Sequence, residues 1–245
     1  MEAAEIKTHV RKYYSGLFEG KLRSRIPVLS GKRLAEALHY PVDLLSSVPD
    51  EYWNSFAPCG NPLPYLSVAG GNRILNLGCG AGIDSFALMK VFRLPITIIN
   101  LDVVPSVLQK ARLIENDFNH SEHTVEWICS DAEALPTVGE AFNWVIMNGV
   151  FNLLPDKRRV LEEVHRVLAP SGSLVLADLC RSGPLPDHFQ SEKDAWAWCM
   201  SGACTERELF SLMRGAGFAQ ARLVREENED MFYRVSLICR KGEGG

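Results

Sequence analysis

The feature that most constrains this chain is a short apolar run that ends in a glycine-dense turn. Residues 74–77 have the composition of a buried strand, and Gly78, Gly80 and Gly82 follow them directly. Because these glycines have no Cβ atom, they allow the backbone to turn sharply and to lie against a ligand. The pattern therefore predicts a site at which a ligand contacts the main chain itself.

A second strand and an acidic residue follow the glycine turn. Residues 85–92 have a helical pattern, residues 96–101 have the composition of another buried strand, and Asp102 ends that strand. In a β-α-β unit of this kind, a carboxylate at the end of the second strand accepts hydrogen bonds from the hydroxyl groups of a ribose. We therefore interpret the stretch as a nucleotide-cofactor site.

The spacing of the glycines separates several classes of nucleotide cofactor. The dinucleotide fingerprint G-x-G-x-x-G would need glycine at position 83, which is Ile83, and a Walker P-loop would need Gly-Lys-Ser/Thr, for which no lysine stands near. The G-x-G-x-G pattern after a strand resembles that of class I methyltransferases, whose fold is doubly wound. The resemblance implies S-adenosyl-L-methionine as the cofactor.

Later segments fall where the methyltransferase resemblance expects them. After a third predicted strand at residues 124–129, Asp131 and Ala132 match the positions that bind the adenine ring in that family. A fourth predicted strand, residues 142–147, ends at Asn148, in the loop that faces the methyl group in relatives. The predicted cofactor-binding residues are Asn76, Gly78, Cys79, Gly80, Gly82, Asp102, Val103, Asp131, Ala132 and Asn148.

The second half of the chain completes the sheet. A helix opened by Pro155 and Asp156 and ended by residues 170–172 leads to a fifth predicted strand at residues 173–177. A helix over residues 206–217 then precedes two strands, residues 219–226 and 231–240, which a polar connection over residues 227–230 joins. We therefore expect an α/β, doubly wound, mostly parallel seven-stranded sheet with an antiparallel C-terminal hairpin, the Rossmann-like methyltransferase fold.

Residues 1–72 precede this sheet and are expected to form a helical N-terminal lid on the cofactor-binding domain, residues 73–245. Helices are predicted over residues 3–19, 32–39 and 41–49. Ligands of doubly wound sheets lie beyond the carboxyl ends of the strands, so the lid must cross that edge to enclose them. Two interpretations of its aromatic side chains stay open, packing on the cofactor and anchoring of the lid to the core; these side chains are Tyr13, Tyr14 and Trp53.

Three segments, residues 56–62, 147–157 and 198–203, resemble arsenite methyltransferases in particular. That family carries one cysteine in each segment; Cys59 and Cys199 match, but the middle position is Gly149. The resemblance implies that the thiolates of Cys59 and Cys199 act as the catalytic groups, because trivalent arsenic is thiophilic and its lone pair can attack the sulfonium methyl group.

The missing third cysteine limits which arsenical fits. With Gly149, the matching positions cannot supply three thiolates. Two alternatives stay open: a monomethylated arsenical, which offers two exchangeable positions, or a third thiol from Cys180, Cys204 or glutathione.

Two other functions also stay open. An O-, N- or C-methyltransferase that acts on a small metabolite would need a base for many acceptors, with Tyr13, Tyr14 or Asp178 as candidates. A catalytically silent cofactor-binding module is conceivable because two positions depart from the family patterns. They are Gly149 and Asn76, which stands two residues before the first glycine, where methyltransferases commonly carry an acid.

The composition and net charge limit the kinds of substrate, partner and compartment that are expected. The 245 residues are 47% hydrophobic, and Lys+Arg of 26 against Asp+Glu of 30 gives a net charge of −4 without a strongly basic run, which favours a small-molecule substrate over a nucleic acid. No apolar run approaches the roughly 20 residues of a membrane span, and no signal peptide is recognisable, so a cytoplasmic protein is expected. Seven scattered cysteines indicate reduced thiols, of which Cys79, Cys129 and Cys239 are interpreted as packing residues. The sequence does not indicate an oligomeric state.

Overall fold

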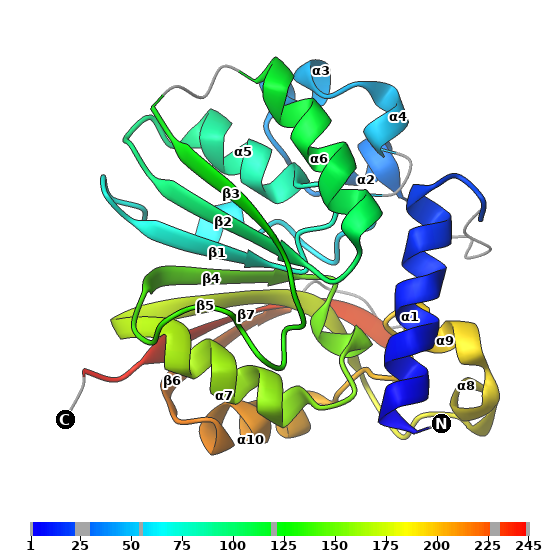
Figure 1. Ribbon diagram of the computed structural model, residues 1–245. Coiled ribbons are helices and arrows are strands. Elements are labelled where there is room, and N and C mark those ends of the chain that lie inside the picture. Colours follow the sequence, from blue (N-terminus) through cyan, green and yellow to red (C-terminus); the bar gives the residue numbers. More distant parts are fainter. Residues whose placement is uncertain (1, 23–29, 54–55, 119–121, 226–230, 244–245) are drawn as a thin grey trace.

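Seven strands form one twisted sheet in the order β3-β2-β1-β4-β5-β7-β6 (Figure 1). This computed structural model describes residues 2–22, 30–53, 56–118, 122–225 and 231–243. Neighbouring strands from β3 to β5 run parallel, whereas β7 runs antiparallel to both β5 and β6, so the predicted sheet is confirmed. The strands are β1 (Arg73–Leu77), β2 (Thr97–Asp102), β3 (Thr124–Cys129), β4 (Phe142–Asn148), β5 (Leu168–Arg181), β6 (Phe218–Arg225) and β7 (Phe232–Lys241).

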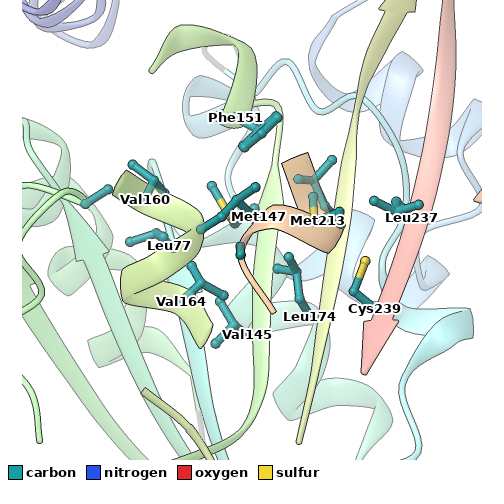
Figure 2. Close-up of a cluster of buried hydrophobic side chains, with 14 of the residues drawn as sticks. Leu77, Val145, Met147, Phe151, Val160, Val164, Leu174, Met213, Leu237 and Cys239 are labelled. Atoms are coloured by element: carbon teal, nitrogen blue, oxygen red, sulfur yellow. The ribbon is translucent and has the colours of Figure 1, made fainter. Parts of the chain in front are cut away.

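Helices cover both faces of this sheet (Figure 1). The helices α5 (Ile83–Val91) and α6 (Pro105–Asp117) lie on one face, and α7 (Lys157–Val167) and α10 (Glu206–Gly215) lie on the other. The second group buries a cluster that includes Val160 and Val164 of α7 against strand residues such as Leu174 (Figure 2). Each such side chain contributes about 1.5–3 kcal/mol by its burial, so apolar packing holds α7 in place.

The local sequence explains where α7 and α10 begin. Asp156 precedes α7, and its side chain accepts a hydrogen bond from the Arg159 N–H at 3.0 Å. Thr205 and Glu208 form a capping box at the start of α10, with each side chain bonded to the other residue's backbone N–H. Both caps satisfy amide groups that have no partner within the helix.

The N-terminal segment divides into two parts. Buried side chains of its second part, among them Leu44 and Trp53, join the cluster that includes Phe86 of α5. The first helix instead stands across the edge at which the parallel strands end (Figure 1). The elements of the segment are α1 (Ala3–Phe18), α2 (Gly31–Ala37), α3 (Val42–Ser47), α4 (Asp50–Trp53) and the 3-10 turn η1 (Leu63–Tyr65).

Short helices complete the edge near α1. They are the 3-10 turn η2 (Phe151–Leu153), α8 (Asp187–Ser191) and α9 (Lys193–Ala197). β1 lies between β2 and β4, so the strand order reverses there and the chain leaves β1 and β4 toward opposite sides. Crevices at such a switch point, beyond the carboxyl ends of the strands, are the usual ligand sites of this architecture.

Several local predictions need correction. α6 was not among the predicted helices, and α7 ends at Val167, because Leu168 already belongs to β5 and pairs with Phe142. Cys239 is a core residue, as predicted (Figure 2), but Cys129 is exposed. The predicted connection over residues 227–230 lies outside the described residues. Within the described parts of the chain, no helix combines the length and the apolar character that crossing a membrane requires.

Candidate functional site

A cavity of about 280 Å³ opens at the carboxyl ends of β1, β2 and β4. Its wall consists of the glycine turn, the ends of the neighbouring strands, one side of α1 and residues 56–58. Ligand cavities usually hold about 300–1,000 Å³, so this one is small, as expected with α1 lying over it. The cavity lies at the switch point of the sheet and includes most of the predicted cofactor-binding residues, namely Gly78, Cys79, Gly80, Asp102, Val103, Asp131, Ala132 and Asn148.

The glycine turn needs glycine for two reasons. Gly78, Gly80 and Gly82 all have positive φ angles, between 52° and 81°, which L side chains rarely adopt. In addition, a Cβ atom on Gly78 would lie 2.4 Å from the Val150 side chain, and one on Gly82 would lie 2.4 Å from Trp127. The turn is therefore fixed by packing and exposes the backbone of Gly78 and Gly80 to the cavity.

Asp102 lies beside the glycine turn with a fixed orientation. One carboxylate oxygen accepts the Gly80 N–H and the other accepts the Val104 N–H, each at 2.9 Å. Burial raises the pKa of Asp102, although these backbone hydrogen bonds act in the opposite direction. A preoriented carboxylate at a cavity wall suits two neighbouring ribose hydroxyls, as the sequence predicts.

The opposite wall holds an ion pair that the sequence did not indicate. Lys7 of α1 reaches the carboxylate of Asp131 at 2.8 Å and that of Glu133 at 2.6 Å. Burial alone would raise the pKa of Asp131, but the Glu133 N–H and Lys7 lower it below its usual value. Lys7 thereby fastens α1 at the end of the cavity where the adenine ring is expected.

Asn148 organises the other end of the cavity. Its side-chain oxygen accepts the N–H groups of Cys59 and Gly60, at 3.0 and 3.2 Å. Its amide donates to Asp84 at 3.1 Å and to the Tyr40 hydroxyl, also at 3.1 Å. Tyr40 in turn donates to Asp84 at 2.5 Å. One amide at the end of β4 therefore holds the cysteine loop and a buried carboxylate together.

Cys59 and Cys199 lie side by side, although about 140 residues separate them in the sequence. Their sulfur atoms and a carboxylate oxygen of Asp178 all lie within 4.8 Å of one another, and all three residues are buried. The Cys59 thiol lies 3.7 Å from Asp178, and the Cys199 thiol lies 3.6 Å from the Gly149 carbonyl oxygen. The structure thus brings together the two predicted thiols and a carboxylate from the end of β5.

The surroundings of the two thiols favour their protonated form. Hydrogen bonding with Cys199 lowers the pKa of Cys59, but burial and the nearby Asp178 carboxylate outweigh it, so the pKa of Cys59 is raised. The pKa of Cys199 is raised well above its usual value by the hydrogen bond with Cys59 and by burial. The pair can therefore bind a thiophilic centre only if the thiol protons leave with another group.

Gly149 separates the thiol pair from the cavity. Neither cysteine lines the cavity, whereas Gly149 does. A Cβ atom at position 149 would lie 3.6 Å from the Cys59 sulfur and 3.2 Å from the Ala57 carbonyl oxygen. Only the backbone of Gly149 therefore stands between the thiols and the cavity, at the position where the resemblance to arsenite methyltransferases calls for a third cysteine.

The helix α1 is tied by hydrogen bonds to the segment that carries Cys199. The Tyr14 hydroxyl donates to the Ala197 carbonyl oxygen at 3.0 Å, and the Trp198 indole donates to the Tyr13 hydroxyl at 3.0 Å. Cys199 itself has a φ of 62°, a strained conformation for a residue other than glycine. α1 and the Cys199 segment therefore form one side of the site.

Some predicted contacts lie away from the cavity. Asn76 is buried, and its amide donates to Ser85 at 2.9 Å, beneath the glycine turn. Gly82 packs against Trp127 and begins α5. Of the lid aromatics, Tyr14 lines the cavity, whereas Tyr13 and Trp53 do not, which supports the anchoring interpretation for those two.

The sequence interpretation missed several residues of the site. Asp84 lies in the first turn of α5, where a carboxylate is usually read as a partner of the helix dipole. Lys157 lies near the thiol pair; burial lowers its pKa, while the thiols of Cys204 and Cys199 and the Asp178 carboxylate act in the opposite direction. Tyr40 carries no signal in the sequence that distinguishes it from an ordinary core tyrosine.

Comparisons with known proteins agree with this geometry. Residues 69–217 match the family described as "Methyltransferase domain". The chain is 33% identical to the arsenite methyltransferase of Halobacterium salinarum over 198 residues, which cover 81% of this chain and 50% of that protein. It is 28% identical to the human arsenite methyltransferase over 231 residues, or 90% of this chain and 60% of that protein.

A solved structure supports the same relationship. The arsenic(III) S-adenosylmethionine methyltransferase of Chlamydomonas reinhardtii superposes with a TM-score of 0.63 at 26% sequence identity, and the match covers 86% of this chain and 73% of that one. The chain spans 50% to 63% of the length of the five curated arsenite methyltransferases that it matches.

Proposed function

Because this chain belongs to the methyltransferase domain family, with S-adenosylmethionine as its cofactor, we propose that it methylates a small trivalent arsenical held by the thiolates of Cys59 and Cys199. The acceptor that we propose is a monomethylated arsenical. The observation that carries the proposal is the buried thiol pair, which lies next to Gly149, a residue of the cavity wall.

The cavity residues fit the cofactor. In this proposal the exposed backbone of the glycine turn lies against the methionine part, Asp102 accepts the ribose hydroxyls, and Asp131 accepts the adenine amino group. When bound, the cofactor supplies a methyl carbon on a sulfonium centre. The chain's own task is to hold the acceptor within about 3 Å of that carbon and to keep water out, which reduces much of the barrier.

Thiol chemistry explains why two cysteines suffice. A monomethylated arsenical with two hydroxyl groups can form two As–S bonds, and each thiol proton leaves with one hydroxyl group as water. Because the protons leave during this exchange, the free protein does not need to hold Cys59 and Cys199 as thiolates. This agrees with the raised pKa of both thiols, which favours their protonated form. Methyl transfer then requires the arsenic lone pair to reach the cavity past Gly149, which has no side chain.

The neighbouring residues favour an acceptor that needs no base. The Tyr14 hydroxyl donates a hydrogen bond to the Ala197 carbonyl oxygen, and burial raises the pKa of Tyr14 well above the usual value. Asp178 already accepts the backbone N–H groups of Asn152 and Leu179 and the side-chain amide of Asn152. Tyr14 is therefore a poor proton acceptor for an O- or N-methylation, and the Asp178 oxygens are committed to these hydrogen bonds, although burial raises the pKa of Asp178.

The experiment is a methylation assay with a radiolabelled methyl donor and three acceptors: arsenite, methylarsenite, and methylarsenite with glutathione. We expect dimethylated arsenic from methylarsenite, identified by its mass, and little product from arsenite alone. Glutathione is included because an external thiol can deliver the acceptor and remove the product.

Three results would count against the proposal. Unchanged product formation by both the Cys59→Ser and Cys199→Ser variants would exclude thiolate capture. Transfer of the label to an oxygen, nitrogen or carbon acceptor, with none to arsenic, would identify a small-metabolite methyltransferase instead. Cofactor binding without any methylated product in a broad panel of acceptors would indicate a silent module.

A further inference from the structure

Asp84 is a buried carboxylate that lines the cavity without a cation beside it. Its exposure is 8%, and among the described residues no Lys, Arg or His forms an ion pair with it. Its partners are neutral: the Tyr40 hydroxyl at 2.5 Å and the Asn148 amide at 3.1 Å. Burial raises the pKa of Asp84 to about 6, even though both hydrogen bonds favour the charged form. A buried carboxylate without a positively charged partner is destabilised in its charged form.

Asn76 cannot supply negative charge to the same region. It is neutral, 1% exposed and absent from the cavity wall, and its amide donates to Ser85. Ser85 in turn donates to Asn100 at 2.5 Å, so the polar groups beneath the glycine turn form an uncharged network. The cavity therefore needs another anion for the positively charged end of its ligand.

The acidic residues of the cavity lie in an order that matches the cofactor. Asp131 lies at one end, Asp102 lies beside the turn, and Asp84 lies at the other end with Asn148, next to the Cys59 loop. The first two suit the adenine and the ribose. Asp84 remains for the amino-acid part, which carries the α-ammonium group.

We infer that the Asp84 carboxylate binds the α-ammonium group of the methionine part of S-adenosylmethionine, held in place by Tyr40 and Asn148. The inference rests on the cofactor of the proposed function but not on its arsenical acceptor. Tyr40 also donates to the Gly60 carbonyl oxygen at 3.1 Å, so this positioning network continues into the backbone beside Cys59. The charge of the ligand would thus be matched in the same region that orients the acceptor loop.

A consequence is selectivity among adenine nucleosides. An ammonium group that enters this end of the cavity gives Asp84 the cation that it lacks, and such charge-assisted hydrogen bonds are stronger in a poorly solvated site. A nucleoside without the amino group leaves the carboxylate buried and unpaired. The protein should therefore discriminate against ligands that keep the adenosine and the thioether but have lost the amine.

The test is a cycle of two proteins and two ligands measured by calorimetry. The proteins are the wild type and the Asp84→Asn variant; the ligands are S-adenosylhomocysteine and its deaminated analogue, in which hydrogen replaces the α-amino group. We expect the wild type to bind S-adenosylhomocysteine at least about tenfold more tightly than the analogue, and the variant to bind the two within about threefold.

An Asp102→Asn variant is the matched control. It also loses a buried carboxylate at the cavity wall, but it should weaken both ligands by a similar factor, because both carry the ribose. Thermal unfolding of each variant shows whether it is folded, and an Asp84→Ser variant replaces Asp84→Asn if the latter does not fold.

The outcomes separate this inference from the proposed function. Equal binding of both ligands by the wild type, or the same preference in the wild type and the Asp84→Asn variant, would overturn the role of Asp84 and leave the cofactor assignment intact. No binding of S-adenosylhomocysteine by the wild type would instead remove the cofactor on which both depend.

Discussion

Replacement of Asp84 by asparagine should make the ligand-free protein more stable at neutral and alkaline pH. The folded protein holds this carboxylate in a buried site, and its pKa rises from 3.8 to about 6. A raised pKa in the folded state means that the stability present below pH 3.8 is lost as the pH rises through 6. The wild type therefore carries a penalty at pH 8 that the neutral amide avoids.

The size of this penalty follows from the pKa shift. A change of about two pKa units corresponds to about 3 kcal/mol at pH 8, about half of that at pH 5 and about 0.5 kcal/mol at pH 4. An asparagine at position 84 can still accept the Tyr40 hydroxyl proton, so most of the local geometry is kept. For a chain of this size, about 3 kcal/mol corresponds to a rise in Tm of roughly 6–12 °C at pH 8.

The assay is thermal and urea unfolding of the wild type and the Asp84→Asn variant at pH 8 and pH 5, without ligand. We expect the variant to be more stable at pH 8 and the difference to shrink by about half at pH 5. A variant that is less stable by the same amount at both pH values would refute the reasoning, because Asp84 would then be an ordinary, satisfied core carboxylate. If the Asp84→Asn variant is more stable but binds the ligand more weakly, then Asp84 serves ligand binding and not the stability of the fold.

Three further predictions concern the thiol pair and the fold. Cys59→Ser and Cys199→Ser should each lower methylation of methylarsenite by about 100-fold or more, whereas Cys129→Ser, an exposed control, should leave the rate unchanged; equal rates in all three would contradict the dithiolate site. Gly149→Cys should improve arsenite methylation relative to Gly149→Ala, because both have the strain of about 1–2 kcal/mol from a φ of 67° but only one adds a thiol. Thr205→Ala should cost about 1 kcal/mol of stability through the lost capping box, without any change in cofactor affinity; a shift in affinity would argue against a purely local effect.

The fold was largely predictable because its signals are local. Short apolar runs of β-branched residues predicted strands β1 to β4 within one residue at each end, and the glycine turn indicated where β1 meets α5. The end of α7 was misplaced because Leu168 continues the apolar spacing of the helix, whereas in the structure it pairs with Phe142 in the sheet. Such a choice depends on a partner strand that the sequence around Leu168 does not reveal.

The site was predictable only where a residue belongs to a motif. The glycine turn and Asp102 follow from the β-α-β pattern, and Cys59 and Cys199 follow from the resemblance to arsenite methyltransferases. Tyr40 and Asp84 come from distant segments and meet only in the folded chain, where Tyr40 donates to Asp84 and Asn148 bonds to both. Their importance arises from tertiary contacts and burial, which neither spacing nor composition encodes.

The helix α1 is a second case in which tertiary contacts could not be predicted from the sequence. Helical spacing predicted α1, but its function depends on contacts with α9 and with the cavity wall, which lie more than 100 residues away in the sequence. The ion pair of Lys7 with Asp131 is an example, since neither residue has a neighbour in the sequence that suggests the pairing. Only the arrangement of the elements in space brings this lysine to the adenine end of the cavity.

The most direct measurement of the central claim is X-ray absorption at the arsenic edge of the protein loaded with methylarsenite in the absence of free thiols. The account predicts two sulfur neighbours for each arsenic atom in the wild type, and one in either the Cys59→Ser or the Cys199→Ser variant. One or no sulfur neighbour in the wild type, or two in both variants, would contradict the claim that this buried pair of thiols captures the methyl acceptor.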